Sequence, residues 1–386
     1  MLQKYEKIIN LQKDKVSLKL FRKHPQDISV SLSHRAWVRF SHEPLGIGSL
    51  IFIGLVCLAS ILGYLITPDQ SPYANQQFLE LGLKKPGFKV EMLYIMKADP
   101  PLKSGWFHTM ISGERSIYTA IPVSNYKIIG DTLCYRAYSE PGAAISAENK
   151  ITLKKIIYPV IKTFWLGTDR FGRDYLSQMI IGARVSLAVG FISVFISLLI
   201  GISLGAVAGY FRGWADNLIM WSINVVWSIP TLLLVIAISF ALGRGFWQVF
   251  VAVGLTMWVD VARMVRGQVI SLREKEFVEA GHALGFSDSR IIIRHILPNV
   301  MAAVIVISAA NFASAILLEA GLSFLGLGVQ PPVPSWGSMI KENYGYIILD
   351  YAYLAILPGI AIMLLVLAFM LMGNSLRDAL DVKTRD

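Results

Sequence analysis

The polar stretch between Glu276 and Asn299 holds the residues whose types and spacing are best suited to recognising another surface. Two carboxylates, Glu276 and Glu279, stand at the start of a helical pattern, where the helix dipole favours negative charge. An apolar stripe recurs on this pattern at three- and four-residue spacing: Phe277, Ala280, Gly281 and Leu284. Small residues, Ala283 among them, allow a neighbouring surface to approach closely. The spacing by itself fits an ordinary loop helix, and the small residues also leave room for contact with another surface.

Turn-forming residues divide this stretch into two predicted helices. Gly285 suits the left-handed position that ends the first helix. Ser287 or Asp288 suits the cap of a second short helix, which runs to about Ile296. Pro298 then fits the first turn of the apolar segment that follows. A compact two-helix element is therefore expected between two apolar segments.

Nucleotide chemistry is not encoded in the chain. A P-loop needs Gly, four residues, and then Gly-Lys followed by Ser or Thr. The nearest fragment, GLKKPGFK at 82–89, has Phe88 where the lysine belongs. Cys57 and Cys134 lie far apart in sequence, which argues against a disulfide, and no Cys or His spacing suggests a metal site. If ATP drives this protein, another chain binds the nucleotide.

The composition places these motifs in a membrane protein. Of 386 residues, 54% are hydrophobic and 16% are charged, against roughly 25% charged residues in soluble domains. The mean hydropathy is +0.55. The net charge of +10 does not indicate nucleic-acid binding, because the basic residues are dispersed and flank apolar runs. The lipid bilayer is the expected surrounding.

Six apolar runs are long enough to cross a bilayer core of ~30 Å at about 20 residues each. They cover Leu45 to Ile66, Ser186 to Tyr210, 217–242 with Pro230 inside it, 246–262, 300–318 and 352–373. The first run, assigned to 45–66, begins too late and is too long for a cleaved signal peptide, so we expect it to be retained.

Basic residues in short loops predict the orientation of these spans. With the N-terminal tail 1–44 in the cytoplasm, the segments 1–44, 211–216, 263–299 and 374–386 are cytoplasmic and hold nine, one, six and three Lys or Arg. The short outer loops hold one each. Both termini and the loop 263–299, which contains the two-helix element, are then cytoplasmic.

A long polar insert, residues 67–165, lies between the first two spans on the outer side. Its segments SIYTAIPV and YKIIGDTLCYRAY are rich in β-branched and aromatic residues and are bounded by turn formers, which predicts strands. Two roles are compatible with this pattern. The insert either packs on the membrane domain as a structural element or presents a docking surface to an external partner.

Small and ionisable residues in the spans suggest further contacts. Glycines recur every four residues in the second span: Gly201, Gly205 and Gly209. They predict close helix packing, either within this chain or with a partner. Glu319 is expected near the outer surface or in a water-filled cavity, where it faces a translocation pathway or pairs near the outer turn. Asp260 is expected to pair with Arg263, one turn later.

The segment EAGHALGFSDSRIIIRHILPN resembles the EAA loop of ATP-binding-cassette (ABC) importer permeases. The family pattern is Glu-Ala-Ala, three residues, Gly, nine residues, Ile, one residue and Leu-Pro. Five positions fall in register: Glu279, Ala280, Gly285, Leu297 and Pro298. Two positions depart, since Gly281 replaces the third-position Ala and His295 replaces the Ile. The ending RHILPN is similar to the oligopeptide, dipeptide and nickel branch of the family.

Three more segments are similar to the C-type subunit of that branch: LGTDRFGRDYLSQMIIGARVSL (166–187), EAGLSFLGLGVQPPVPSWGSMI (319–340) and LRDALDV (376–382). Thr168 or Asp169 can cap a helix in the first of them. The resemblance covers about 40–66 and the expected permease core, 166–386, which holds five of the six spans. It does not cover the insert, 67–165.

The resemblance implies an all-α, polytopic fold with six transmembrane helices, the type I ABC importer transmembrane domain, plus a small extracytoplasmic insert that can contain strands. It implies a permease subunit for ATP-driven peptide import across the bacterial inner membrane, with no cofactor or catalysis of its own. Expected partners are a homologous permease, two ABC ATPases that hold ATP and Mg²⁺, and an extracytoplasmic solute-binding protein.

The family's coupling helix docks on the ATPase. Contact with that subunit is therefore implied for ten residues: Glu276, Phe277, Glu279, Ala280, Gly281, Ala283, Leu284, Gly285, Arg290 and Pro298. Two alternatives stay open, namely import of nickel or another small solute by the same architecture, and a self-sufficient secondary transporter.

Overall fold

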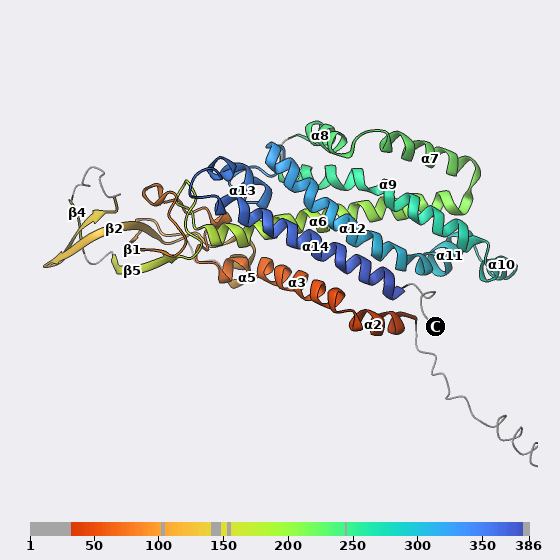
Figure 1. The fold of residues 1–386 in the computed structure, drawn as a ribbon, viewed down its shortest axis with the longest axis horizontal. Helices are drawn as coiled ribbons and strands as arrows, with labels where there is room; N and C mark the ends of the chain where they lie inside the picture. Colours follow the sequence, from red (N-terminus) through yellow and green to blue (C-terminus); the bar gives the residue numbers. More distant parts are fainter. Residues whose placement is uncertain (1–31, 102–104, 140–147, 153–155, 244, 381–386) are drawn as a thin grey trace, which may run out of the picture.

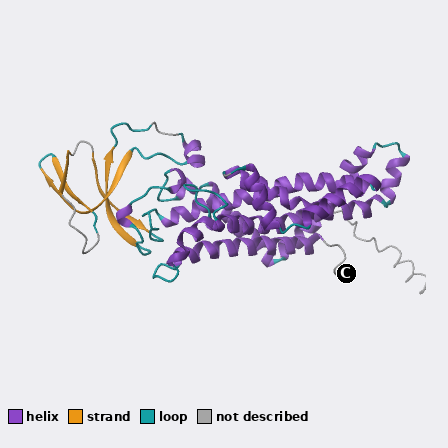
Figure 2. Ribbon diagram, turned by 90° about the horizontal axis from the view of Figure 1, so that it is seen from above, coloured by secondary structure: helices purple, strands orange, loops and turns teal. Residues whose placement is uncertain are grey.

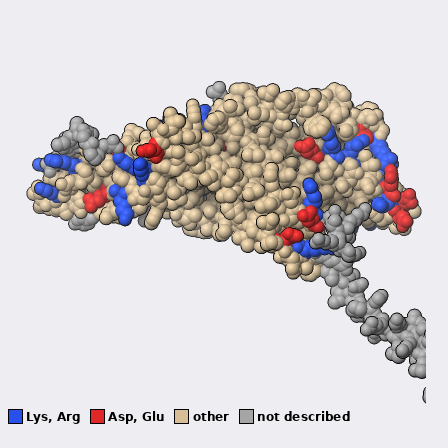
Figure 3. Space-filling model, in the orientation of Figure 1, with Lys and Arg blue, Asp and Glu red and all other residues tan. Residues whose placement is uncertain are grey.

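The structure is a computed structural model and describes residues 32–101, 105–139, 148–152, 156–243 and 245–380. It is elongated, with a helical bundle at one end and a β-sheet at the other (Figure 1). The turned view also shows the strands confined to one end (Figure 2). On the face drawn in Figure 3, charged side chains gather toward the two ends and leave the middle of the bundle almost bare. Such an uncharged zone suits contact with lipid, where charged side chains are costly.

The helical bundle is built from segments on both sides of the insert. Its elements are α2 (Leu32–His42), α3 (Pro44–Ile61), α4 (Gly63–Ile66), α6 (Tyr175–Phe211), α7 (Gly213–Trp227), α8 (Thr231–Leu242), α9 (Phe246–Arg273), α10 (Glu276–Ala283), α11 (Asp288–Ile291), the π-helical turn η4 (Ile292–Ile296), α12 (Leu297–Leu325), α13 (Trp336–Asn343), the short turn η5 (Tyr344–Tyr346) and α14 (Tyr353–Leu380).

Five helical segments of the described chain are long and apolar enough to cross a membrane, and a sixth candidate is bent. The five are α3, α6, α9, the rod formed by α11, η4 and α12, and α14. The bent candidate is the pair α7 and α8, which meet at 95°. Pro230 stands directly before α8, where its ring and missing N–H interrupt helical hydrogen bonding. The prediction of six spans is met when the bent pair counts as one span.

Helix α6 is longer than the second predicted span and begins at Tyr175. The side chain of Asp174 caps it by accepting a hydrogen bond from the Ser177 N–H at 2.8 Å. The predicted caps, Thr168 and Asp169, are therefore wrong. The segment that resembled a separate helix before the span is the first part of one continuous helix.

Helix α9 is also longer than predicted, because it continues to Arg273 rather than ending near Ala262. The first part of the 263–299 loop is consequently helical and continues the fourth span. A basic residue in the last helical turn suits the negative end of the helix dipole.

The glycine row of α6 packs against α9 within this chain. A Cβ atom on Gly201 would meet the Val261 Cβ at 2.5 Å. A Cβ atom on Gly205 would meet the Ala262 carbonyl at the same distance, 2.5 Å, and Gly209 continues the row in the same way. Only glycine allows the two backbones to approach this closely. Of the two predicted partners for this row, the one within the chain is correct.

The insert forms a five-stranded antiparallel sheet in the order β4-β3-β2-β1-β5. Its elements are β1 (Phe88–Met96), β2 (Tyr118–Ile129), β3 (Thr132–Ala137), β4 (Glu148–Thr152) and β5 (Ile156–Phe164), together with α5 (Trp106–Ser112) and the short turns η1 (Pro72–Ala74) and η2 (Leu79–Leu81). Both predicted strand segments are confirmed as β2 and β3. Neighbouring β1 residues Met92 and Leu93 point to opposite faces, and each is fully buried in its own apolar cluster.

Buried hydrogen bonds fasten the insert to the bundle. The Asp69 N–H donates to the Ser177 hydroxyl of α6 at 3.0 Å. The Thr168 hydroxyl donates to the Leu81 carbonyl and accepts from the Lys84 N–H. These contacts agree with the structural role predicted for the insert. An external docking role stays a prediction.

Candidate functional site

Helix α10 lies at the end of the molecule opposite the sheet (Figure 1). Glu276 and Glu279 occupy its first turn, as predicted. Gly285 lies just after the end of the helix and stops it. Its φ of +76° is the left-handed conformation that glycine adopts without strain. The following N–H, that of Phe286, donates back to the Gly281 carbonyl at 3.0 Å and closes the helix end. The prediction of a glycine helix stop is confirmed.

The apolar stripe predicted on α10 is divided between an outward and an inward side. Leu284 is 71% exposed and Phe277 is 40% exposed. Gly281 is buried instead, and a Cβ atom there would lie 3.5 Å from Ile291 of α11. The outward side, called the docking surface below, consists of exposed residues: Glu276, Phe277, Glu279, Ala280, Ala283 and Leu284. Large apolar side chains exposed beside carboxylates are typical of an interaction site.

Tyr210, in the last turn of α6, holds the 276–299 element in place. Its hydroxyl donates to Asp288 of α11 at 2.7 Å and lies 3.3 Å from His282 Nε2 of α10. The Arg273 guanidinium lies 5.5 Å from the centre of the Tyr210 ring. Asp288 therefore binds across to another helix, and Ser287, which stands at the cap position, makes no side-chain capping bond. The predicted side-chain cap is not present at either residue.

Phe286 organises the second half of the element. The Arg290 guanidinium lies 4.1 Å from the centre of the Phe286 ring. The His295 ring stacks on Phe286 with a centroid distance of 5.7 Å and an interplanar angle of 11°. His295 Nε2 is buried and has no hydrogen-bond partner among the described residues. The structure thus gives this departure from the family pattern a packing role.

The element passes into the fifth span without a break. α11, η4 and α12 are one continuous helical rod, whereas the sequence predicted a separate helix that ends near Ile296. Pro298 lies in the first turn of α12, as predicted. The wider π-helical turn directly precedes it, where the proline N cannot donate a helical hydrogen bond. The second half of the element and the fifth span are therefore one helical unit.

The predicted pair of Asp260 and Arg263 does not form. The Arg263 guanidinium lies 3.7 Å from the centre of the Trp227 ring, at the end of α7. The bidentate pair in this region is between Arg266 of α9 and Asp216 of α7, at 2.5 and 2.7 Å. Because α7 folds back on α9, Arg263 contacts Trp227 of α7 rather than Asp260, its neighbour one turn away.

Glu319 is fully buried near the end of α12, with 0% exposure, so its side chain does not face a water-filled cavity in this structure. One carboxylate oxygen accepts from Ser323 at 2.7 Å, and the other accepts from Ser186 of α6 at 3.2 Å. The alternative in which this residue pairs near the turn after the span agrees with these contacts. A place on the translocation pathway is not supported by them.

A buried ion-pair network joins the segment before α6 to α13. The Arg173 guanidinium contacts Asp169 at 2.5 Å and Glu342 at 2.7 Å. Burial alone lowers the pKa of Arg173, but the two carboxylates outweigh that effect and raise the pKa above its usual value. This geometry gives Arg173 a structural role, because it links Asp169 to Glu342 of α13.

Comparisons with known proteins match two parts of the chain to one family of transport proteins. Residues 201–386 match the family described as "Binding-protein-dependent transport system inner membrane component". Residues 31–86 match the N-terminal transmembrane domain of oligopeptide transport permease C. The two matches leave out most of the β-sheet insert, which agrees with its absence from the predicted resemblance.

Individual relatives agree with the family matches. The glutathione transport system permease protein GsiD of Pectobacterium atrosepticum is 40% identical over 239 residues, which cover 62% of this chain and 79% of that protein. The dipeptide transport system permease protein DppC of Alkalihalophilus pseudofirmus is 43% identical over 221 residues, covering 57% and 72%.

A solved structure of the MetNI methionine ABC transporter in an inward-facing conformation is 18% identical, covers 53% of this chain and 97% of that chain, and has a TM-score of 0.45. The family matches and the identity to full-length relatives carry the assignment. The chain belongs to the ABC importer permeases, in the branch of the oligopeptide permease C-type subunits.

Proposed function

We propose that this chain is the permease subunit of an ATP-driven importer for short peptides, with dipeptide-like and glutathione-like molecules as its substrate class. The names of the relatives support this class. The observation that carries the proposal is the docking surface. It is exposed, apolar and acidic, and it lies on the short helix α10. This helix contacts Tyr210 of one span through His282, and the turn at Gly285 joins it to the rod that forms another span.

The docking surface binds one of two ABC ATPases, which hold the ATP and Mg²⁺ that this chain has no P-loop to bind. Phe277 and Leu284 supply apolar contact area, and Glu276 and Glu279 supply charge that a basic rim on the ATPase complements. A homologous permease completes the pathway, and a solute-binding protein delivers the peptide on the sheet side. The docking end faces the cytoplasm, with both termini on that side.

Movement of the ATPases drives the transport cycle through two routes in this chain. One route is the rod of α11, η4 and α12, which follows the docking helix after the turn at Gly285. The other is the hydrogen bond from Tyr210 to Asp288, which joins the same element to α6. Closure of the ATPases on ATP shifts the element, and the attached spans rock between inward-facing and outward-facing arrangements.

The test is co-expression of the full chain with the homologous permease and ABC ATPases of its own genome, followed by affinity purification and measurement of ATP hydrolysis. Glu279→Lys and Leu284→Asp are expected to lower co-purified ATPase at least tenfold. Lys127→Glu, an exposed charge reversal in β2, is the matched control and should leave association unchanged. A wild-type chain that captures no ATPase and changes no ATP hydrolysis contradicts the proposal.

A further inference from the structure

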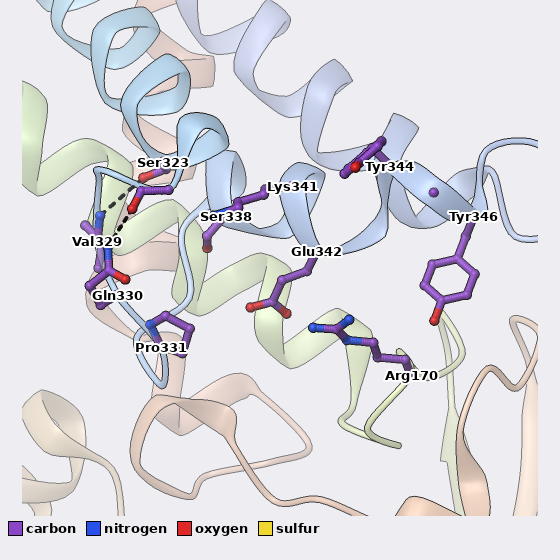
Figure 4. A pocket seen from close by; sticks show the side chains of 12 residues that line it. Arg170, Ser323, Val329, Gln330, Pro331, Ser338, Lys341, Glu342, Tyr344 and Tyr346 are labelled. Atoms are coloured by element: carbon purple, nitrogen blue, oxygen red, sulfur yellow. Dashed lines mark hydrogen bonds between the residues drawn. The ribbon is translucent and has the colours of Figure 1, made fainter.

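A cavity of about 670 Å³ lies at the sheet-side end of the bundle, far from the docking surface. It is enclosed by the loop after α12, by α13 and η5, and by Arg170 from the segment before α6 (Figure 4). Its size falls within the ~300–1,000 Å³ that is usual for small-molecule sites. Neither the proposed coupling nor the family matches give it a role.

The cavity carries an excess of positive charge. Its one carboxylate, that of Glu342, is already paired with the buried Arg173 at 2.7 Å. The two cations of the lining, Arg170 and Lys341, are exposed and make no ion pair with any described residue. Two positive charges are therefore available to an anionic ligand.

Both cations are held in place by the fold rather than by a counter-ion. The Lys341 ammonium lies so close to Gly326 that a Cβ atom there would be 2.1 Å from its Nζ. Gly326 has φ of +81° and ends α12, so the ammonium sits at the negative end of that helix dipole. The Arg170 guanidinium lies 4.5 Å from the centre of the Phe171 ring.

The remaining lining is polar and aromatic. The Gln330 side chain is fixed by hydrogen bonds from its Nε2 to the Gly326 and Gly328 carbonyls. Tyr344 packs edge-on against Phe324 at 6.0 Å, and Tyr346 also lines the cavity (Figure 4). Aromatic walls and fixed amide groups suit a ligand that combines a charged end with peptide bonds and side chains.

The buried Glu319 supports a loop that lines this cavity, through Ser323. It accepts a hydrogen bond from Ser323, whose hydroxyl in turn accepts the Val329 N–H at 3.3 Å. This chain of hydrogen bonds holds the loop that carries Gln330 against the end of α12. Glu319 acts on the cavity as a positioning residue and does not line it.

We propose that this cavity is a binding site for the free C-terminal carboxylate end of a short peptide, with Arg170 and Lys341 as the residues that recognise the carboxylate. The proposal rests on the proposed peptide-import function and adds a place where this chain itself contacts the substrate. Charge-assisted hydrogen bonds from a guanidinium and an ammonium are a strong means of holding a carboxylate.

The test uses the full chain in nanodiscs made only of phosphatidylcholine, with trialanine as the probe and calorimetric titration as the readout. The double variant Arg170→Gln/Lys341→Gln is expected to bind trialanine at least tenfold more weakly than wild type. Trialanine amide, which lacks the carboxylate, should bind wild type at least tenfold more weakly than trialanine. Arg136→Gln/Lys127→Gln removes two exposed charges from the sheet and serves as the matched control.

Three results overturn the proposal: no binding of trialanine by wild type, equal affinity of the double variant and the control, or equal affinity for the acid and the amide. A fourth is loss of trialanine binding when phosphatidylglycerol is added to the nanodiscs, since that result assigns the cavity to anionic lipid headgroups. Association with ATPases does not involve this cavity, so the double variant keeps it. The two proposals can therefore fail independently.

Discussion

The hydroxyl of Tyr210 donates a 2.7 Å hydrogen bond to Asp288, which joins the end of α6 to the element that carries the docking surface. The two residues are 78 positions apart in sequence. Through Tyr210, α6 contacts both α10, at His282, and the rod that begins at α11, at Asp288. The element 276–299 is thereby attached to two spans, α6 through Tyr210 and α12 through the continuous rod.

Tyr210→Phe is expected to loosen this element without unfolding the chain. The substitution removes the hydrogen bond to the Asp288 carboxylate and keeps the ring beside Arg273. A hydrogen bond to a charged group contributes about 1.5–3 kcal/mol, so local opening of α10 and α11 should increase more than tenfold. Hydrogen–deuterium exchange of the full chain in nanodiscs measures this change.

The control for that substitution is Tyr126→Phe in β2, which should leave exchange in α10 and α11 unaltered. Equal protection of the two helices in wild type and Tyr210→Phe would show that the hydroxyl does not hold the element.

Gly205→Ala is expected to destabilise the chain, because the new Cβ atom would lie 2.5 Å from the Ala262 carbonyl of α9. Relief of such a clash costs about 1–3 kcal/mol, so the midpoint of thermal unfolding should fall. Gly54→Ala in α3 is the matched control, because no other atom lies within 4 Å of its new Cβ. That variant should be as stable as wild type or more so, since alanine favours helix. Equal midpoints for the two variants would contradict the close packing of α6 on α9.

Local signals made part of this architecture predictable from the sequence. Gly285 and Pro298 mark helix boundaries through their own backbone chemistry, and both lie where that chemistry places them. The glycine row of α6 predicted a close helix contact for the same reason, although spacing did not identify α9 as the partner. The strand-rich composition of the insert likewise predicted β2 and β3.

Residue spacing could not predict contacts between segments that are distant in sequence. The bend after α7 places Trp227 against Arg263, so the charge pair expected one turn away does not form. Hydrophobicity and charge alone placed Glu319 near water, whereas serines from two helices allow it to be buried. In the sequence, Tyr210 stands out only as an aromatic residue at the end of a predicted span. Because aromatic residues are common at membrane interfaces, this position did not predict its contact with Asp288.

Glu319→Ala is expected to lower the free energy of unfolding by about 2–6 kcal/mol. The reason is that Ser186 and Ser323 would lose a buried acceptor, at about 1–3 kcal/mol for each unsatisfied group. Glu319→Gln keeps an acceptor oxygen at nearly the same size and should lose less. Thermal unfolding of both variants in the same detergent provides the comparison. A Glu319→Ala variant as stable as wild type would favour an exposed position on a water-filled pathway instead.

Arg173→Met is expected to destabilise the chain strongly. The arginine and Asp169 are almost fully buried, and loss of the cation would leave Asp169 and Glu342 without a counter-charge. Removing one partner of a buried pair costs about 3–5 kcal/mol, so the midpoint of thermal unfolding should fall by more than in Gly205→Ala. Arg173→Lys keeps the charge but cannot reach both carboxylates with one planar group, so its stability should lie between those of wild type and Arg173→Met. If Arg173→Met instead unfolds at the wild-type midpoint, the network does not fasten α13 to the start of α6.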